Sequence, residues 1–241
     1  RYTAVDAAII GDAREVARSM TAGLADAGWE PRRSRWVDQH EAAAPSGADR
    51  LPAEPDVGAG FVDIRAAAAV LGRTLPPDAA LVSDVGRFNL STWRHLHAAE
   101  PGAFITMDNF GSIGLGLPGA IGACFARPGM PTVLSVGDGG LMMGIADLAT
   151  AVREAIPLVI AVWDDDAYGF EYVELEHHGF DPEYSRNDFP DIADLAAGMG
   201  LRTRRVECLA DLEGVDDLWR QGMDGPVLLD IKIGRRHLMS Y

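Results

Sequence analysis

Two clusters of aspartate and glycine residues could hold a metal ion and a phosphate. Residues 137–140, Gly-Asp-Gly-Gly, follow the apolar run 133–136, and three aspartates at 164–166 follow the apolar run 158–163. Apolar runs of this length are typical of buried strands in a parallel sheet, and open sheets of this kind bind ligands at the carboxyl ends of their strands. Carboxylate oxygens suit Mg²⁺, while glycines let backbone N–H groups approach a phosphate. The pattern therefore predicts a magnesium diphosphate site.

The rest of the sequence predicts the elements that would position this site. Strands are expected at 80–83, 104–106, 132–136, 158–163, 201–206 and 227–233. Helices are expected at 62–75, 91–99, 118–126, 145–154, 191–199 and 209–221. Because strands alternate with helices, we expect an α/β fold: a doubly wound, mostly parallel sheet with helices on both faces.

The N-terminal part differs from the rest in composition and pattern. A strand at 4–10 and a helix at 12–27, which begins on an aspartate N-cap, precede residues 32–60, which are rich in Ala, Pro and acidic residues. One strand and one helix cannot bury their apolar faces alone. We therefore expect residues 1–31 to be a piece of another domain, 32–60 to be a linker and 61–241 to be the ligand-binding domain.

Composition argues against several classes of partner. The chain has a formal net charge of −15 and a pI near 4.7, which disfavours binding to nucleic acid or to an anionic membrane. No apolar run is long enough to span a bilayer and no signal peptide is visible, so we expect a soluble, cytoplasmic protein. Cys124 and Cys208 are too few for a disulfide framework, and their flanking residues predict that both are buried.

A glycine pattern at 114–119 offers an alternative function. It fits G-x-G-x-x-G, follows a predicted strand and opens a predicted helix, and Asp138 lies at the distance of a ribose-binding acid. A dinucleotide-binding module, or a catalytically silent regulatory module, is therefore the second hypothesis. Against it, Asp138 is followed by two glycines and is matched by the second acidic cluster, and a ribose contact needs neither.

Residues 137–169 resemble the thiamine diphosphate signature of the acetolactate synthase and 2-oxo acid decarboxylase family. In that signature, a Gly-Asp-Gly strand end is followed by an Asn-Asn or Asn-Asp pair at the next strand end. The string DLATAVREAIPL that begins at Asp147 is similar to the connector between the two in this family. The resemblance extends over residues 61–233 and identifies the diphosphate-binding, C-terminal portion of such an enzyme.

The resemblance implies the cofactor and the residues that hold it. The cofactor would be thiamine diphosphate with Mg²⁺, and the metal ligands would be Asp138, Asp165 and the backbone carbonyl of Ala167. Ile113 would be an apolar wedge that bends the cofactor into a V, and the carbonyl of Gly111 would accept a hydrogen bond from the aminopyrimidine ring. The other residues that would contact the cofactor are Asn89, Gly137, Gly139, Gly140, Tyr168, Gly169 and Phe170.

Three of the candidate residues also have ordinary structural interpretations. Asp138 could merely cap the helix that follows it, and Ile113 could be a core isoleucine. Glu171 resembles a glutamate that works near the substrate carboxylate in the decarboxylase branch, and it could equally be a solvated helix residue. Ile113 and Glu171 are the candidate catalytic residues of this chain.

The chain departs from the family at two places. Asp164 and Asp165 stand where the family usually has amides. The loop at 84–89 corresponds to one that carries a Gln-His pair in acetolactate synthases, whereas this chain has Arg87-Phe88. This second departure leaves the identity of the substrate open, and Arg87 or Asn89 could bind a phosphate or a carboxylate.

The resemblance implies an enzyme, either a lyase or a transferase. It would remove CO₂ from a 2-oxo acid and then transfer or release the resulting carbanion, with the cofactor supplying the chemistry. In this family the glutamate that activates the cofactor belongs to a pyrimidine-binding domain of a partner subunit, and nothing in this sequence resembles that domain. Residues 1–31 resemble the strand and helix that close the family's central domain, and the chain starts at Arg1 rather than Met. We therefore expect an incomplete catalyst that works in a homo-oligomer, a dimer or tetramer, with the missing domain or subunit.

Overall fold

The computed structural model describes residues 8–30, 57–98, 100, 102–220 and 223–234. The chain divides into two compact units, Arg1–Gly47 and Ala48–Tyr241. The described part of the first unit contains helix α1 (Ala13–Asp26), whose N-cap Asp12 accepts hydrogen bonds from the N–H groups of Arg14 and Glu15. The sequence predicted this helix and its cap. The strand predicted at 4–10 is not seen at residues 8–10, and residues 4–7 and 31–56 lie outside the described part of the chain.

The second unit is built on a six-stranded sheet in which all paired strands are parallel. The strands are β1 (Ala80–Ser83), β2 (Phe104–Thr106), β3 (Thr132–Gly137), β4 (Leu158–Asp164), β5 (Arg202–Val206) and β6 (Val227–Lys232). Their order is β2-β1-β3-β4-β6-β5. The direction of the order reverses between β1 and β3, and this reversal is where open α/β sheets form a ligand-binding crevice. All six strands were predicted from the sequence, with ends shifted by one residue at most.

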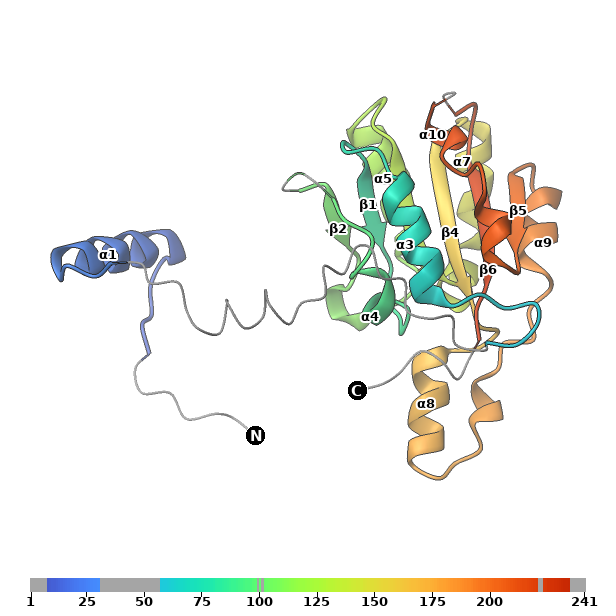
Figure 1. The fold of residues 1–241 in the computed structure, drawn as a ribbon, viewed down its shortest axis with the longest axis horizontal. Coiled ribbons are helices and arrows are strands. Elements are labelled where there is room, and N and C mark those ends of the chain that lie inside the picture. The colour runs from blue at the N-terminus through green and yellow to red at the C-terminus, as the bar shows by residue number, and fades with distance from the viewer. Residues whose placement is uncertain (1–7, 31–56, 99, 101, 221–222, 235–241) are drawn as a thin grey trace. The chain divides into compact units, whose positions relative to one another are not determined.

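Helices cover both faces of the sheet, as predicted (Figure 1). One face packs against α3 (Ile64–Thr74), η4 (Leu209–Leu212) and α10 (Asp217–Arg220), and the other packs against α5 (Gly116–Ala126), α7 (Leu148–Arg153) and α9 (Ile192–Gly198). Because successive strand residues point to opposite faces, β4 supplies both cores: Val159, Ala161 and Trp163 to the first, and Leu158, Ile160 and Val162 to the second.

The remaining helices lie in loops beside the strand ends. They are α4 (Asn89–Thr92), η1 (Asn109–Gly111), α6 (Asp138–Met143), η2 (Ile145–Asp147), α8 (Gly169–His177) and η3 (Pro182–Ser185). In Figure 1, α8 extends past one edge of the sheet, beyond the end of β4. Since α8 follows β4 directly in sequence, this is the carboxyl edge, where the site was expected.

Four sequence-based expectations about local structure are wrong or too coarse. The helix expected at 91–99 is the single turn α4, and the helix expected at 209–221 is split into η4 and α10, with Gly214 between them at a left-handed φ of 71°. The helix expected at 145–154 begins as the 3₁₀ turn η2 before α7. Cys208, expected to be buried, is exposed because it precedes η4 on the surface, whereas Cys124 is buried as expected. Among the described residues, no helix combines the length and apolarity needed to cross a membrane.

Candidate active site

The carboxyl ends of β1, β3 and β4 border one cavity of about 460 Å³. Every residue that the sequence assigned to catalysis, cofactor binding or metal binding lines this cavity. These residues are Asn89, Gly111, Ile113, Gly137, Asp138, Gly139, Gly140, Asp165, Ala167, Tyr168, Gly169, Phe170 and Glu171. Four separate segments of the chain therefore meet where the sequence placed a single site. The cavity brings the residues together, and their individual roles remain predictions.

Asp138 is the most strongly perturbed acid of the site. It begins α6 directly after β3 and is only 3% exposed. Burial, followed by the negative charges of Asp165 and Asp164, raises the pKa of Asp138 to about 8, although a hydrogen bond from Asn187 opposes the shift. Asn187 Nδ2 donates to Asp138 Oδ2 over 3.1 Å. A buried carboxylate whose ionised form is destabilised in this way is well suited to be a ligand of a divalent cation.

The loop that follows β4 is held in a fixed conformation by a neighbouring segment. Ala167 and Arg186 form an antiparallel bridge, and the Tyr168 N–H donates to the Ser185 carbonyl over 2.9 Å. The Asn187 N–H donates to the Asp166 carbonyl over 3.2 Å, and Asp166 has a left-handed φ of 54°. This pairing fixes the course of the backbone at Ala167, whose carbonyl is the third predicted metal ligand.

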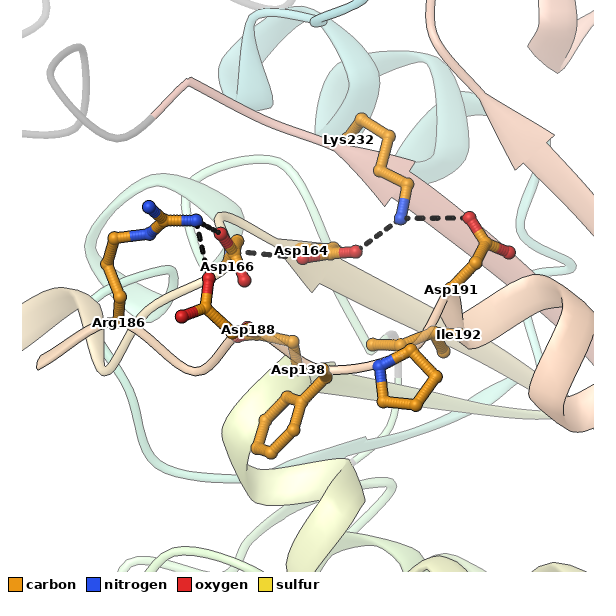
Figure 2. Close-up of a pocket in the computed structure, with 10 residues that line it drawn as sticks. Asp138, Asp164, Asp166, Arg186, Asp188, Asp191, Ile192 and Lys232 are labelled. Atoms are coloured by element: carbon orange, nitrogen blue, oxygen red, sulfur yellow. Dashed lines mark hydrogen bonds and ion pairs between the residues drawn. The ribbon is translucent and has the colours of Figure 1, made fainter.

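Asp164 does not line this cavity and forms an ion pair with Lys232, a residue that sequence reasoning missed (Figure 2). The two residues pair in register at the ends of β4 and β6, and Lys232 Nζ lies 2.5 Å from Asp164 Oδ2 and 2.8 Å from Asp230 Oδ2. Burial favours the neutral amine, but the two ion pairs outweigh it and raise the pKa of Lys232. Burial also raises the pKa of Asp230 to about 6 despite the pairing with Lys232. Asp164 therefore serves an ion-pair network.

Asp166 is half-buried and forms an ion pair with Arg186 at 2.9 Å. Arg186 also pairs with Asp188 at 2.6 Å (Figure 2). These residues and Lys232 line a second cavity of about 420 Å³, which shares Asp138 with the first. Within the described residues, no group of three or more His, Cys, Asp or Glu side chains is arranged to hold a metal. A metal at Asp138 would therefore need other oxygen ligands as well, such as a backbone carbonyl, water or phosphate.

The glycine pattern at 114–119 is explained by packing. Asp84, 1% exposed at the end of β1, accepts hydrogen bonds from the N–H groups of Gly114 and Gly116 at 3.0 and 3.1 Å. A Cβ at Gly116 would lie 2.7 Å from the Asp84 side chain, and a Cβ at Gly119 would lie 2.8 Å from Met107. The amides that a dinucleotide phosphate would use are therefore already bonded to a carboxylate of the chain. The pattern fixes the loop that carries Ile113 into the cavity.

Residues 84–231 match the family described as "Thiamine pyrophosphate enzyme, C-terminal TPP binding domain". This range covers more than half of the 241-residue chain. The chain belongs to this family. Thiamine diphosphate, the same compound as thiamine pyrophosphate, is therefore the cofactor of the domain, and the α/β fold expected from the resemblance is confirmed.

Individual relatives agree with this assignment. This chain is 32% identical to the acetolactate synthase isozyme 2 large subunit of Escherichia coli, over 66% of this chain and 29% of the relative. It is 34% identical to pyruvate oxidase of Lactiplantibacillus plantarum, over 65% of this chain and 26% of the relative. A solved structure, the thiamine diphosphate-dependent 4-hydroxybenzoylformate decarboxylase of Rhodococcus jostii RHA1, superposes with a TM-score of 0.68 at 25% identity, over 78% of this chain and 35% of that one.

The chain spans less than a third of the length of these two sequence relatives. The family match and these relatives support the interpretation that residues 84–231 resemble the thiamine diphosphate-binding domain of an acetolactate synthase or a decarboxylase. Nothing in the comparisons supports the alternative of a dinucleotide-binding or catalytically silent regulatory module.

The loop after β1 contributes residues whose structural roles the sequence did not reveal. Asn89 Nδ2 donates to the Asp84 carbonyl over 2.9 Å, while Ser83 Oγ donates to Asn89 Oδ1 over 3.0 Å. Trp93 Nε1 donates to Ser83 Oγ over 2.9 Å. The Asn89 side chain thus braces this loop at the cavity wall. Arg87 Nη1 donates to the Gly169 carbonyl over 2.8 Å and ties the same loop to the start of α8.

Gly139→Ala should destabilise the second unit of the chain, Ala48–Tyr241, because a Cβ at this position would lie 2.6 Å from the ring of Tyr168. Overpacking of this kind costs about 1–3 kcal/mol. The matched control is Gly122→Ala in α5, where an added Cβ meets nothing within 4 Å. That change should be neutral or stabilising by up to about 1 kcal/mol. Urea unfolding of both variants measures the difference, and equal midpoints would refute the contact between Gly139 and Tyr168.

Proposed function

We propose that the cavity at the carboxyl edge binds the diphosphate of thiamine diphosphate through Mg²⁺. The ligands are Asp138, Asp165 and the backbone carbonyl of Ala167. The observation that carries this proposal is Asp138, a carboxylate 3% exposed whose pKa is raised to about 8 by burial and by neighbouring acids. A divalent cation would neutralise this cluster and the diphosphate together.

The other residues of the cavity position the cofactor. Gly137, Gly139 and Gly140 border the cavity without side chains, so the diphosphate approaches the backbone at the start of α6. Ile113 is half-buried and lines the cavity, where its side chain would keep the two rings of the cofactor bent. Gly111 is exposed, with a left-handed φ of 66°, and its carbonyl would accept a hydrogen bond from the pyrimidine amine.

The reaction is decarboxylation of a 2-oxo acid, followed by release or transfer of the remaining fragment. When bound, thiamine diphosphate supplies a carbon nucleophile and an acceptor for the electron pair left by CO₂. Phe170 and Glu171 lie in the first turn of α8 and line the same cavity, and both residues are exposed. Phe170 shapes the substrate site, and Glu171 acts near the substrate carboxylate.

The complete enzyme is an oligomer in which a pyrimidine-binding domain or subunit covers this cavity. Large apolar side chains beside the site support this: Phe110 is fully exposed, Phe170 is 49% exposed and Leu115 is 39% exposed. Apolar groups gathered at one place on a surface mark an interface. This chain covers less than a third of the length of its two sequence relatives, which is consistent with a further domain in the complete enzyme.

Isothermal titration tests the cofactor proposal. The 241-residue chain is titrated with thiamine diphosphate in Mg²⁺ and in EDTA, and separately with NAD and FAD. We expect saturable heat only with thiamine diphosphate and Mg²⁺ together. Equal affinity in EDTA would exclude a metal bridge, and tight binding of NAD or FAD alone would overturn the assignment of the site.

The chain by itself should not turn over a 2-oxo acid, because the activating glutamate is proposed to come from the covering domain. The measurement is pyruvate decarboxylation by the purified chain with thiamine diphosphate and Mg²⁺. Addition of a family pyrimidine-binding domain is the complementation arm. Turnover of about 1 s⁻¹ by the chain alone, which is normal for a competent enzyme, would contradict the proposed division of labour.

A further inference from the structure

Asn187 contacts the buried carboxylate of the proposed site and restricts it. Its Nδ2 donates to Asp138 Oδ2 over 3.1 Å, although the two residues are 49 positions apart in sequence. Asp138 is 3% exposed, so water has little access to this bond. The Asn187 side chain also lies close to the start of α6, because a Cβ built on Gly139 would lie 3.5 Å from its Nδ2. One of the two oxygens of Asp138 is therefore bonded to a donor of the chain.

Asn187 belongs to a short segment, residues 185–188, which we call the strap. The strap pairs with the loop that follows β4, since Arg186 and Ala167 form an antiparallel bridge. The Asn187 N–H donates to the Asp166 carbonyl over 3.2 Å. The Arg186 side chain adds an ion pair with Asp166 at 2.9 Å (Figure 2). Backbone and side-chain contacts together attach the strap to this loop, so Asn187 is a donor in a fixed place.

The strap contacts two of the three proposed metal ligands, and these two follow different strands. The Asn187 side chain contacts Asp138, directly after β3. The Arg186 backbone pairs with Ala167, beyond the end of β4. A partner that hydrogen-bonds a ligand side chain orients it and tunes its affinity for the metal. We propose that Asn187 is a positioning residue that holds one oxygen of Asp138 and leaves the other for the cation, so that the site prefers Mg²⁺ to the larger Ca²⁺. This inference rests on the proposed magnesium site.

The two cations differ in the coordination that they accept. Mg²⁺ requires nearly ideal octahedral geometry with oxygens at about 2.1 Å, whereas Ca²⁺ accepts roughly six to eight oxygens and binds carboxylates through one oxygen or both. While Asn187 holds Oδ2, Asp138 offers a single oxygen, which suits the compact shell of Mg²⁺. Without Asn187, the carboxylate is able to turn and offer both oxygens, and this arrangement favours Ca²⁺. The Asn187 side chain therefore acts on the choice of metal.

Metal titration in the presence of thiamine diphosphate tests this role. The metal-free parent and Asn187→Leu, which keeps the approximate volume of the side chain and removes the donor, are titrated with Mg²⁺ and, separately, with Ca²⁺. Asn187→Leu should weaken Mg²⁺ binding about tenfold or more, as is usual when such a partner is lost, and Ca²⁺ binding less than about threefold. The ratio of Mg²⁺ affinity to Ca²⁺ affinity should therefore fall. A ratio that changes by less than about threefold, or that rises, would overturn the role of Asn187 in metal selection.

Asn187→Ser keeps the experiment decisive if Asn187→Leu does not fold, which thermal unfolding in EDTA shows. Serine suits irregular loops, but its shorter side chain moves the donor away from Asp138, so the same fall in the ratio is expected. The matched control is Glu183→Gln, which removes an exposed ion pair with Arg186 at 3.4 Å and keeps Asn187. This control should change either affinity by less than about twofold. A similar fall of the ratio in Glu183→Gln would assign the effect to the whole segment and overturn the specific role of Asn187.

The behaviour of the parent chain separates a failure of this inference from a failure of the proposed function. If the parent binds thiamine diphosphate only with metal, and Asn187→Leu leaves the ratio of the two metal affinities unchanged, the role of Asn187 alone is refuted. If the parent binds thiamine diphosphate equally well in EDTA, no metal bridges the site, and the proposed function and the role of Asn187 fail together.

Discussion

Asp138→Asn should make the metal-free chain more stable while abolishing its magnesium-dependent binding of thiamine diphosphate. The two effects have one cause. Burial and the charges of Asp165 and Asp164 raise the pKa of Asp138 from its ordinary 3.8 to about 8, so ionisation costs free energy in the folded state alone. An amide of the same shape removes that cost and keeps an oxygen to accept the hydrogen bond from Asn187. It also removes the charge that we propose holds the metal.

The sign of the pH dependence follows from the raised pKa. Below pH 3.8 the carboxyl is protonated in both states and contributes nothing to the difference between them. As the pH rises to about 8, the unfolded chain ionises first, so the free energy of unfolding of the parent falls. At 1.36 kcal/mol per pKa unit, the loss is at most about 6 kcal/mol. The stabilising effect of Asp138→Asn should therefore be small at pH 4 and several kcal/mol at pH 8.

Urea unfolding in EDTA at pH 4, 6 and 8 measures this effect. The exposed Asp78→Asn is the control and should change stability by no more than about 0.5 kcal/mol at any pH. Saturating Mg²⁺ should reduce the gap between the parent and Asp138→Asn, since metal binds only the parent. A pH-independent gap, or a variant that still binds the cofactor in a metal-dependent manner, would show that Asp138 is not the buried ligand.

Lys232→Met should have the largest destabilising effect among single changes near the site. Methionine keeps most of the volume of the side chain but removes the cation that lies 2.5 Å from Asp164 and 2.8 Å from Asp230. Asp230 is fully buried, and the Asp164 side chain is 10% exposed. Breaking a buried ion pair from one side leaves an uncompensated charge and costs about 3–5 kcal/mol.

The control for Lys232→Met is Arg153→Met, which breaks an exposed ion pair with Glu154 and should cost less than about 1 kcal/mol. A second arm replaces Asp164 and Asp230 with asparagine in the Lys232→Met background, which should recover part of the lost stability. Urea unfolding at pH 7 provides the measurement. If Lys232→Met costs no more than Arg153→Met, the network at the end of β6 does not stabilise the fold.

The parts of the site that the sequence predicted are those encoded by strong local patterns. The apolar runs before Asp138 and Asp164 identify adjacent buried strands, and a parallel sheet places their ends at one edge. Few purely structural roles require glycines and aspartates together directly after such strands, so the combination indicates a binding site. The cavity that gathers Asn89, Ile113, Asp138 and Glu171 therefore follows from topology once the strands are assigned.

The parts that were missed depend on tertiary contacts. Lys232 is the last residue of the mostly apolar strand β6, and only the register with β4 reveals its partner Asp164. Asn187 lies in an irregular loop, 49 positions from the Asp138 that it contacts. Helix α8 buries only Tyr172, so it lacks the apolar stripe by which helices are predicted. Long-range pairs of this kind leave no periodic signal in one sequence.

In the proposed site, a metal bridges Asp138, Asp165 and the Ala167 carbonyl to a diphosphate. The most direct measurement is anomalous diffraction from Mn²⁺ in crystals of the 241-residue chain grown with thiamine diphosphate. We expect one strong peak in the cavity of about 460 Å³, with ligand oxygens from those three residues and from the diphosphate at about 2.1 Å, as for a small divalent cation. A peak on the Lys232 side of Asp138 instead, or bound cofactor with no metal beside it, would contradict the assignment.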